Sequence, residues 1–102
     1  MQRSFDVIIT DSANPDQQYG PYRVDQETDS AMEGHVRAGF LSAGLDSGKA
    51  DDAIADEYVR RARGLGITAY ARALGYSSTY DMCVTLGAMP TLLAEIRVPE
   101  AE

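Results

Sequence analysis

The sequence lacks most of the residues on which common catalytic, metal-binding and disulfide chemistries depend. Its 102 residues include one cysteine, Cys83, one histidine, His35, and no tryptophan. A single cysteine excludes an internal disulfide, and a single histidine without a Cys-x-x-Cys pair excludes the usual zinc sites and nucleophilic triads. We therefore expect no metal, no cofactor and no enzymatic activity, with His35 on a helix surface and Cys83 as a buried thiol.

Long apolar runs are also missing. The longest run near the start is Val7-Ile8-Ile9, whereas a secretory signal needs roughly 7–15 apolar residues and a transmembrane helix about 20. Together with the single cysteine, this predicts a cytoplasmic protein without membrane contact. The length, and an apolar content of 44%, are typical of one globular domain, residues 1–102.

Basic side chains are few and unevenly distributed. Nine Lys and Arg stand against sixteen Asp and Glu, which gives a formal charge of −7. Residues 1–57 hold twelve acids and four bases, whereas residues 58–102 hold four acids and five bases. This asymmetry predicts a molecule with an acidic side, although acids also serve simply to keep a small protein soluble.

The spacing of apolar residues predicts an α+β fold. Alternation of apolar and polar residues indicates strands over residues 4–10, about 20–26 and 91–98, with the first strand in the centre. Helical spacing and glycine stops indicate helices between the second and third strands. The expected helices begin at a Ser30-x-x-Glu33 capping box, span about 48–63 and 68–74, and run from Ser77 or Ser78 to Leu86. We therefore predict a small antiparallel sheet of about three strands packed against three or four helices.

One glycine pattern lies where the second and third of these helices meet. Residues 64–69 fit G-x-G-x-x-A, but a dinucleotide-binding turn needs a strand before it, and here a predicted helix precedes it. The sequence therefore favours a turn between two helices, formed by Gly64 and Gly66, over a cofactor site.

Residues 68–86 resemble the helix-turn-helix motif of DNA-binding regulators. Ala71 matches the small contact residue, Leu74 and Val84 match core positions, and Gly75 matches the turn glycine. The resemblance implies that the start of the second helix reads the major groove while nearby arginines meet phosphates. The residues implicated are Ser77, Ser78, Thr79, Tyr80 and Arg72. Asp81 departs from the motif, which has a branched apolar residue there, and the net charge opposes DNA attraction.

Tyrosine supplies six of the eight aromatic residues. Tyrosines are amphipathic, so they either anchor a protein interface or complete the edge of the core. Combined with the acidic first half, they predict a surface that binds a basic partner. The residues that we expect on it are Asp16, Asp25, Glu27, Asp29, Glu33, Tyr19 and Tyr22.

In overall profile the chain resembles the phage proteins that block host defence, anti-CRISPR proteins among them. Those proteins are short, often acidic, cytoplasmic and single-domain, and they lack catalytic motifs. The resemblance implies an inhibitor that binds the basic surface of a protein or of a nucleoprotein complex, with no prediction of oligomeric state. The alternative hypothesis is the helix-turn-helix DNA-binding regulator.

Overall fold

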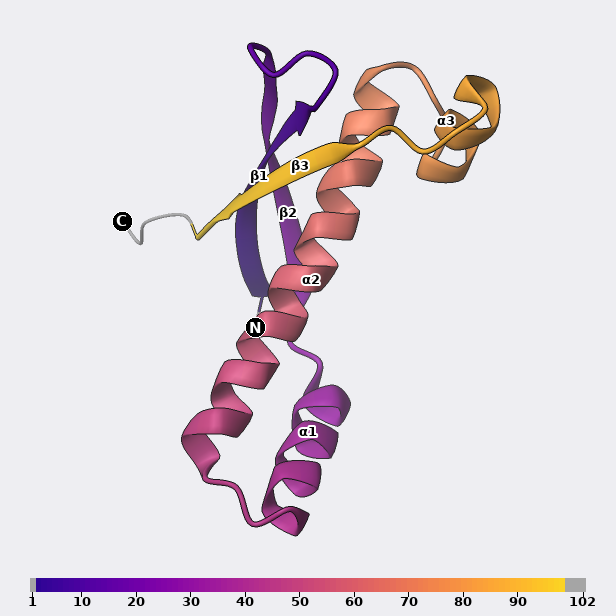
Figure 1. The fold of residues 1–102 in the computed structure, drawn as a ribbon. Coiled ribbons are helices and arrows are strands. Elements are labelled where there is room, and N and C mark those ends of the chain that lie inside the picture. The colour runs from indigo at the N-terminus through magenta and orange to yellow at the C-terminus, as the bar shows by residue number, and fades with distance from the viewer. Residues whose placement is uncertain (1, 99–102) are drawn as a thin grey trace.

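The computed structural model describes residues 2–98 and consists of a sheet layer and a helical layer (Figure 1). The strands are β1 (Gln2–Asp11), β2 (Gln18–Glu27) and β3 (Leu92–Arg97), and the helices are α1 (Ser30–Ser42), α2 (Ser47–Ala73) and α3 (Thr79–Leu86). The sheet is antiparallel with the order β2-β1-β3. The predicted α+β fold, with its first strand in the centre, is confirmed.

The central strand carries much of the core because its residues alternate between two faces. Phe5, Val7 and Ile9 are buried beneath α2, while Asp6 and Ile8 lie on the opposite, open face of the sheet. Val7 and Ile9 have no solvent exposure at all. The alternation that predicted this strand therefore also identified which of its residues enter the core.

The prediction of two helices between residues 48 and 74 is wrong. The chain forms one continuous helix of 27 residues, α2, and neither Gly64 nor Gly66 makes a turn. Gly66 lies where α2 crosses the sheet, and a Cβ atom at this position would overlap the side chain of Val7. Packing across the sheet outweighs the cost of about 1 kcal/mol that each glycine adds in a helix interior.

The first helix also begins differently from the prediction. The N-cap of α1 is Asp29 and not Ser30, because the Asp29 carboxylate accepts a hydrogen bond from the Met32 N–H at 3.0 Å. Glu33 does not complete a capping box but accepts a hydrogen bond from the Tyr58 hydroxyl. For α3 the predicted cap is correct, since the Ser78 hydroxyl accepts from the Asp81 N–H.

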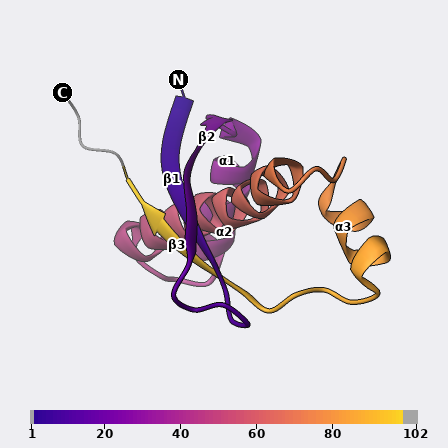
Figure 2. The same cartoon turned by 90° about the horizontal axis from the view of Figure 1, so that it is seen from above.

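The molecule is elongated, with extents of 46 × 35 × 23 Å. Its radius of gyration is 16.2 Å, compared with about 13 Å for a compact chain of this length. The helical hairpin, which we define as residues 30–57, extends past the sheet, and α3 lies at the opposite end of α2 (Figures 1 and 2). None of the residues of α1 is buried, so the hairpin has little core of its own.

Candidate protein-binding surface

Four tyrosines gather where the β1–β2 hairpin meets the C-terminal half of α2. The rings of Tyr19 and Tyr70 pack edge to face, with centroids 5.2 Å apart and planes at 61°. Tyr22 and Tyr76 pack against the same core. We call Tyr19, Tyr22, Tyr70 and Tyr76 the tyrosine cluster. The rings complete the edge of the core, while the side chains of Tyr19, Tyr22 and Tyr76 stay partly exposed.

The surroundings of the cluster raise the pKa of two of its hydroxyl groups, those of Tyr22 and Tyr70. Burial raises the pKa of Tyr70, and the neighbouring charges of Asp11 and the other tyrosines raise it further. Burial also raises the pKa of Tyr22, with a contribution from Tyr19. Within residues 2–98, no buried side-chain nitrogen or oxygen lacks a hydrogen-bond partner. A tyrosine hydroxyl both donates and accepts hydrogen bonds, so the cluster can make polar contacts as well as apolar ones.

One of the five predicted acids lies beside this cluster. Asp16 is exposed on the turn between β1 and β2, close in the chain to Tyr19. Asp11, at the end of β1, is a second acid at this end, and its carboxylate accepts the Ala13 N–H at 2.9 Å. The structure thus brings Tyr19, Tyr22 and Asp11 together around Tyr70, and it places Asp16 on the adjoining turn.

The other four predicted acids lie at the far end of β2 and at the start of α1. A strand of ten residues spans about 30 Å, so Asp25, Glu27, Asp29 and Glu33 are not continuous with Asp16. Asp25 accepts a hydrogen bond from the Ser4 hydroxyl at 2.5 Å, and Glu27 accepts one from the side-chain amide of Gln2 at 2.9 Å. The predicted residues therefore form two separate groups and not one acidic patch.

Asp29 and Glu33 bind other parts of the same chain. Arg61 lies 2.8 Å from the Asp29 carboxylate, and the pKa of Asp29 is lowered by the Met32 N–H and by Arg61. The Tyr58 hydroxyl donates to Glu33 at 2.6 Å and accepts from the Asp29 N–H at 2.9 Å. Because Tyr58 has no solvent exposure, these contacts form a polar junction between α1 and α2, which we call the Tyr58 junction.

The residues expected to read DNA are largely engaged inside the protein. Ser78 caps α3, and the Ser77 N–H donates to the Asp81 carboxylate at 2.9 Å. The Thr79 hydroxyl lies 3.2 Å from that of Thr68 on α2. Tyr80 projects into solvent, with 78% of its surface exposed.

The surroundings of α3 are apolar and not basic. Val84 lies one turn after Tyr80 on the same side of α3 and is 61% exposed, and Leu86 at the end of the helix is 54% exposed. Arg72 lies exposed in the last turn of α2, whereas Arg60 and Arg61 bind Glu57 at 3.0 and 3.3 Å. A major-groove helix needs polar side chains that reach base edges and basic ones that reach phosphates, so this arrangement disfavours DNA reading.

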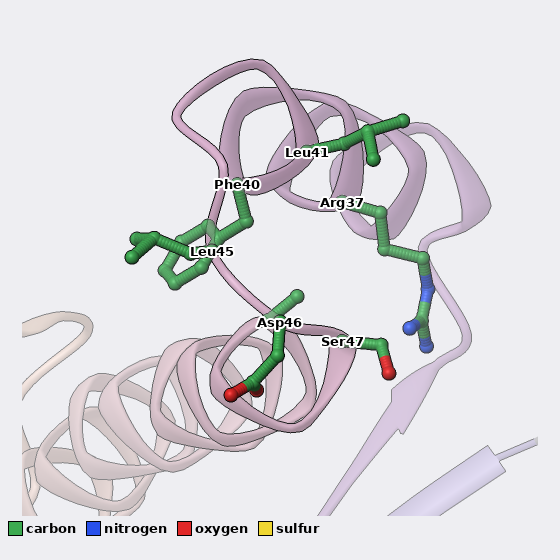
Figure 3. A pocket seen from close by; sticks show the side chains of 7 residues that line it. Arg37, Phe40, Leu41, Leu45, Asp46 and Ser47 are labelled. Carbon is green, nitrogen blue, oxygen red and sulfur yellow. The ribbon is translucent and has the colours of Figure 1, made fainter.

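A small pocket lies at the tip of the helical hairpin (Figure 3). Its volume is about 210 Å³, below the range of roughly 300–1,000 Å³ that is typical of small-molecule sites. Phe40, Leu41 and Leu45 supply its apolar walls, and Arg37 at its rim binds Asp51 at 2.6 Å. The pocket is therefore smaller than a usual small-molecule site, and Asp46 and Ser47 are the other polar residues of its lining.

The described residues contain no group of three or more His, Cys, Asp or Glu side chains that converge as metal ligands. No helix among them is long and apolar enough to cross a membrane. The expectation that Cys83 is buried is wrong, because its side chain is partly exposed and its thiol contacts the Met89 sulfur at 3.2 Å. No family model, curated protein or solved structure matches the chain.

Sequence reasoning missed Tyr70, Tyr76 and Asp11 as members of this surface. A signal for Tyr70 was present, because Tyr58, Ala62, Gly66 and Tyr70 recur at intervals of four, and such spacing places side chains on one face of a continuous helix. Reading Gly66 as a stop interrupted that series. Asp11 and Tyr76 come from loops and strand ends, for which periodicity gives no signal.

Proposed function

We propose that this protein acts by binding a basic surface of another protein or nucleoprotein complex and blocking it. The contact surface in this proposal consists of the tyrosine cluster together with Asp11 and Asp16. The observation that supports it best is the grouping of four tyrosines, three of them partly exposed, beside these two acids.

Tyrosine and carboxylate contribute to binding in different ways. Tyrosines bury a large area and lose little side-chain freedom, so they concentrate binding energy at interfaces. Carboxylates raise the rate of encounter with a positively charged partner, and salt reduces that effect over about 8–10 Å. A protein with a net charge of −7 is repelled by nucleic acid and attracted by the basic surfaces that bind it.

This chemistry suits an antagonist of a host nucleic-acid-binding complex, of the kind that phage anti-CRISPR proteins block. Such complexes hold nucleic acid in grooves rich in Arg and Lys, to which an acidic surface is complementary. The alternative, a DNA-binding regulator, receives less support because α3 exposes Tyr80, Val84 and Leu86 where a reading helix needs polar and basic residues.

The test compares two charge reversals that are matched in type. Asp16→Lys changes the contact surface, whereas Asp52→Lys makes the same change on an exposed position of α2. With immobilised protein and bacterial lysate, we expect the wild type and Asp52→Lys to retain the same basic protein, identified by mass spectrometry. Asp16→Lys should bind that protein about threefold to tenfold more weakly, chiefly through slower association, as measured by surface plasmon resonance.

Two results would contradict the proposal. One is equal binding of the partner by both variants, which would place the interface elsewhere. The other is a specific shift of duplex DNA at nanomolar protein concentration with steep salt dependence, which would support the regulator instead.

A further inference from the structure

Within the described residues the sheet has two outer edges, one formed by β2 and one by β3. β3 is the last strand in the order β2-β1-β3, so half of its backbone groups face away from β1. The Thr91 carbonyl accepts the Ser12 N–H at 2.9 Å, which fixes the direction of that residue toward β1. Because consecutive residues of an antiparallel strand point to opposite sides, the N–H and C=O groups of Leu92, Ala94 and Ile96 point to the free edge.

Charges on the open face form an alternating row that ends at this edge. Arg23 of β2 binds Asp6 of β1 at 2.8 Å, and Asp6 is in register with Arg97 of β3. Arg97 also binds Glu95 on its own strand at 3.0 Å, and both side chains remain more than half exposed. A negatively charged side chain placed next to Arg97 across the free edge would continue this alternation of charges. The same face of β3 carries such a side chain, that of Glu95.

We propose that the protein forms a twofold homodimer in which β3 pairs antiparallel with β3 of a second copy. The twofold axis passes through Ile96, so that each Arg97 lies opposite Glu95 of the partner subunit. These positions alternate with those whose backbone groups bond across the edge, and such non-hydrogen-bonded pairs bring side chains closest together. The two sheets then form one sheet of six strands.

Only this register places Glu95 and Arg97 opposite side chains of the opposite charge in the partner subunit. With the axis through Glu95, that residue would oppose Glu95 of the partner subunit, which is unfavourable. With the axis through Ala94, the charged residues would oppose Leu93 and Thr91 of the partner. The axis through Ile96 also places Val98 opposite Ala94 of the partner subunit. Val98 is 74% exposed, and the pairing would cover it.

The chain exposes more surface than a compact monomer of its mass. The chain exposes 6778 Å², whereas a compact monomer of 11.1 kDa exposes about 5,700 Å². The elongated shape contributes to this excess, and the total leaves room for the roughly 800 Å² per partner that a standard interface buries. The charges of Glu95 and Arg97, which complement each other across a twofold axis, favour a second copy over an unrelated partner at the free edge of β3.

The test is a charge-swap cycle followed by sedimentation equilibrium at micromolar concentrations. In the proposed register, Glu95→Arg alone places two arginines opposite each other at two positions of the dimer. Arg97→Glu alone places two glutamates opposite each other at the same two positions. We expect each single variant to weaken dimerisation by about tenfold or more, and the double variant Glu95→Arg/Arg97→Glu to return within about threefold of the wild type. Asp52→Arg and Arg63→Glu, exposed positions with the same charge changes, should leave dimerisation unaltered.

A backbone variant tests the same edge independently. Ala94→Pro removes an N–H that points away from β1, so the β1–β3 hydrogen bonds remain and the free edge is blocked. We expect a folded monomer by circular dichroism and sedimentation. A wild type that stays monomeric up to about 1 mM would overturn the proposal, as would a dimer in which the double swap fails to restore what the single variants lose. If Ala94→Pro does not fold, the charge-swap cycle decides the outcome.

Discussion

The two halves of α2 are stabilised in different ways. The C-terminal half packs on the sheet, where Ala62, Gly66 and Tyr70 lie against a buried apolar layer. The N-terminal half packs on α1, a helix without a single buried residue. The same helix therefore passes from the core beneath the sheet into a helical hairpin in which α2 buries Ala50 and Ile54 but α1 buries no residue.

This difference shows where each half obtains its stability. Burial of Val7 and Ile9 supplies the sheet half with a hydrophobic core. The hairpin relies more on the Tyr58 junction, where the Gln26 side-chain amide donates to the Tyr58 carbonyl at 2.8 Å and the Tyr58 hydroxyl bridges Asp29 and Glu33. Substitutions in the two halves should consequently differ in size and even in sign.

The largest effect is expected where α2 crosses the sheet. Gly66→Ala places a methyl group into the Val7 side chain, so either the helix or the strand must move. We expect a loss of about 2–3 kcal/mol of unfolding free energy, measured by urea denaturation. Gly64→Ala is the matched control, because nothing lies within 4 Å of its Cβ position. It should stabilise the protein by up to about 1 kcal/mol; a loss at both positions would contradict the close approach at Gly66.

Gly66 also illustrates how far the sequence predicts this fold. The strands and the cap at Ser78 were predictable because they depend on local alternation and on a local hydrogen bond. The continuity of α2 was not, because it depends on contact between Gly66 and Val7, which lie far apart in the chain. The candidate surface was predicted in part, through Asp16, Tyr19 and Tyr22. The internal pairing of Asp29 with Arg61 requires a fold in which α1 turns back on α2, and composition does not contain that information.

A smaller effect, confined to the hairpin, is expected at the Tyr58 junction. Tyr58→Phe keeps the buried ring but removes the hydroxyl that accepts from the Asp29 N–H and donates to Glu33. We expect a loss of about 1–2 kcal/mol, because both partners lose a hydrogen bond at a partly buried site. Hydrogen exchange should accelerate in α1 and remain slow in β1. Tyr80→Phe, at an exposed ring, is the control; uniform acceleration across the sheet and α1 would refute the separation of the two halves.

The Asp29 carboxylate at the same junction should make the free energy of unfolding depend on pH in the acidic range. The folded protein lowers the pKa of Asp29 through the Met32 N–H and Arg61, so the unfolded state binds the proton first as pH falls. The contribution of Asp29 is therefore complete above about pH 4, the ordinary range of an aspartate, and is lost as pH falls through the lower folded value. Asp29→Asn retains an N-cap acceptor and should flatten this part of the profile. Asp52→Asn should leave it unaltered, and an equal flattening in both variants would argue against the Asp29–Arg61 pair.

The smallest effect, opposite in sign to that at Gly66, is expected inside α1. Gly39 lies in the helix interior, and nothing lies within 4 Å of its Cβ position. Gly39→Ala should stabilise the protein by about 0.5–1 kcal/mol, because alanine loses less backbone entropy in a helix and meets no neighbour. Thermal unfolding should show a rise of a few degrees, with slower hydrogen exchange concentrated in α1. Gly44, just beyond the end of α1, also has open space around it, but its φ is +75°. Gly44→Ala should therefore destabilise. If both substitutions destabilise the protein, α1 is more tightly packed than the open space around Gly39 indicates, and the contrast between the two halves of α2 fails.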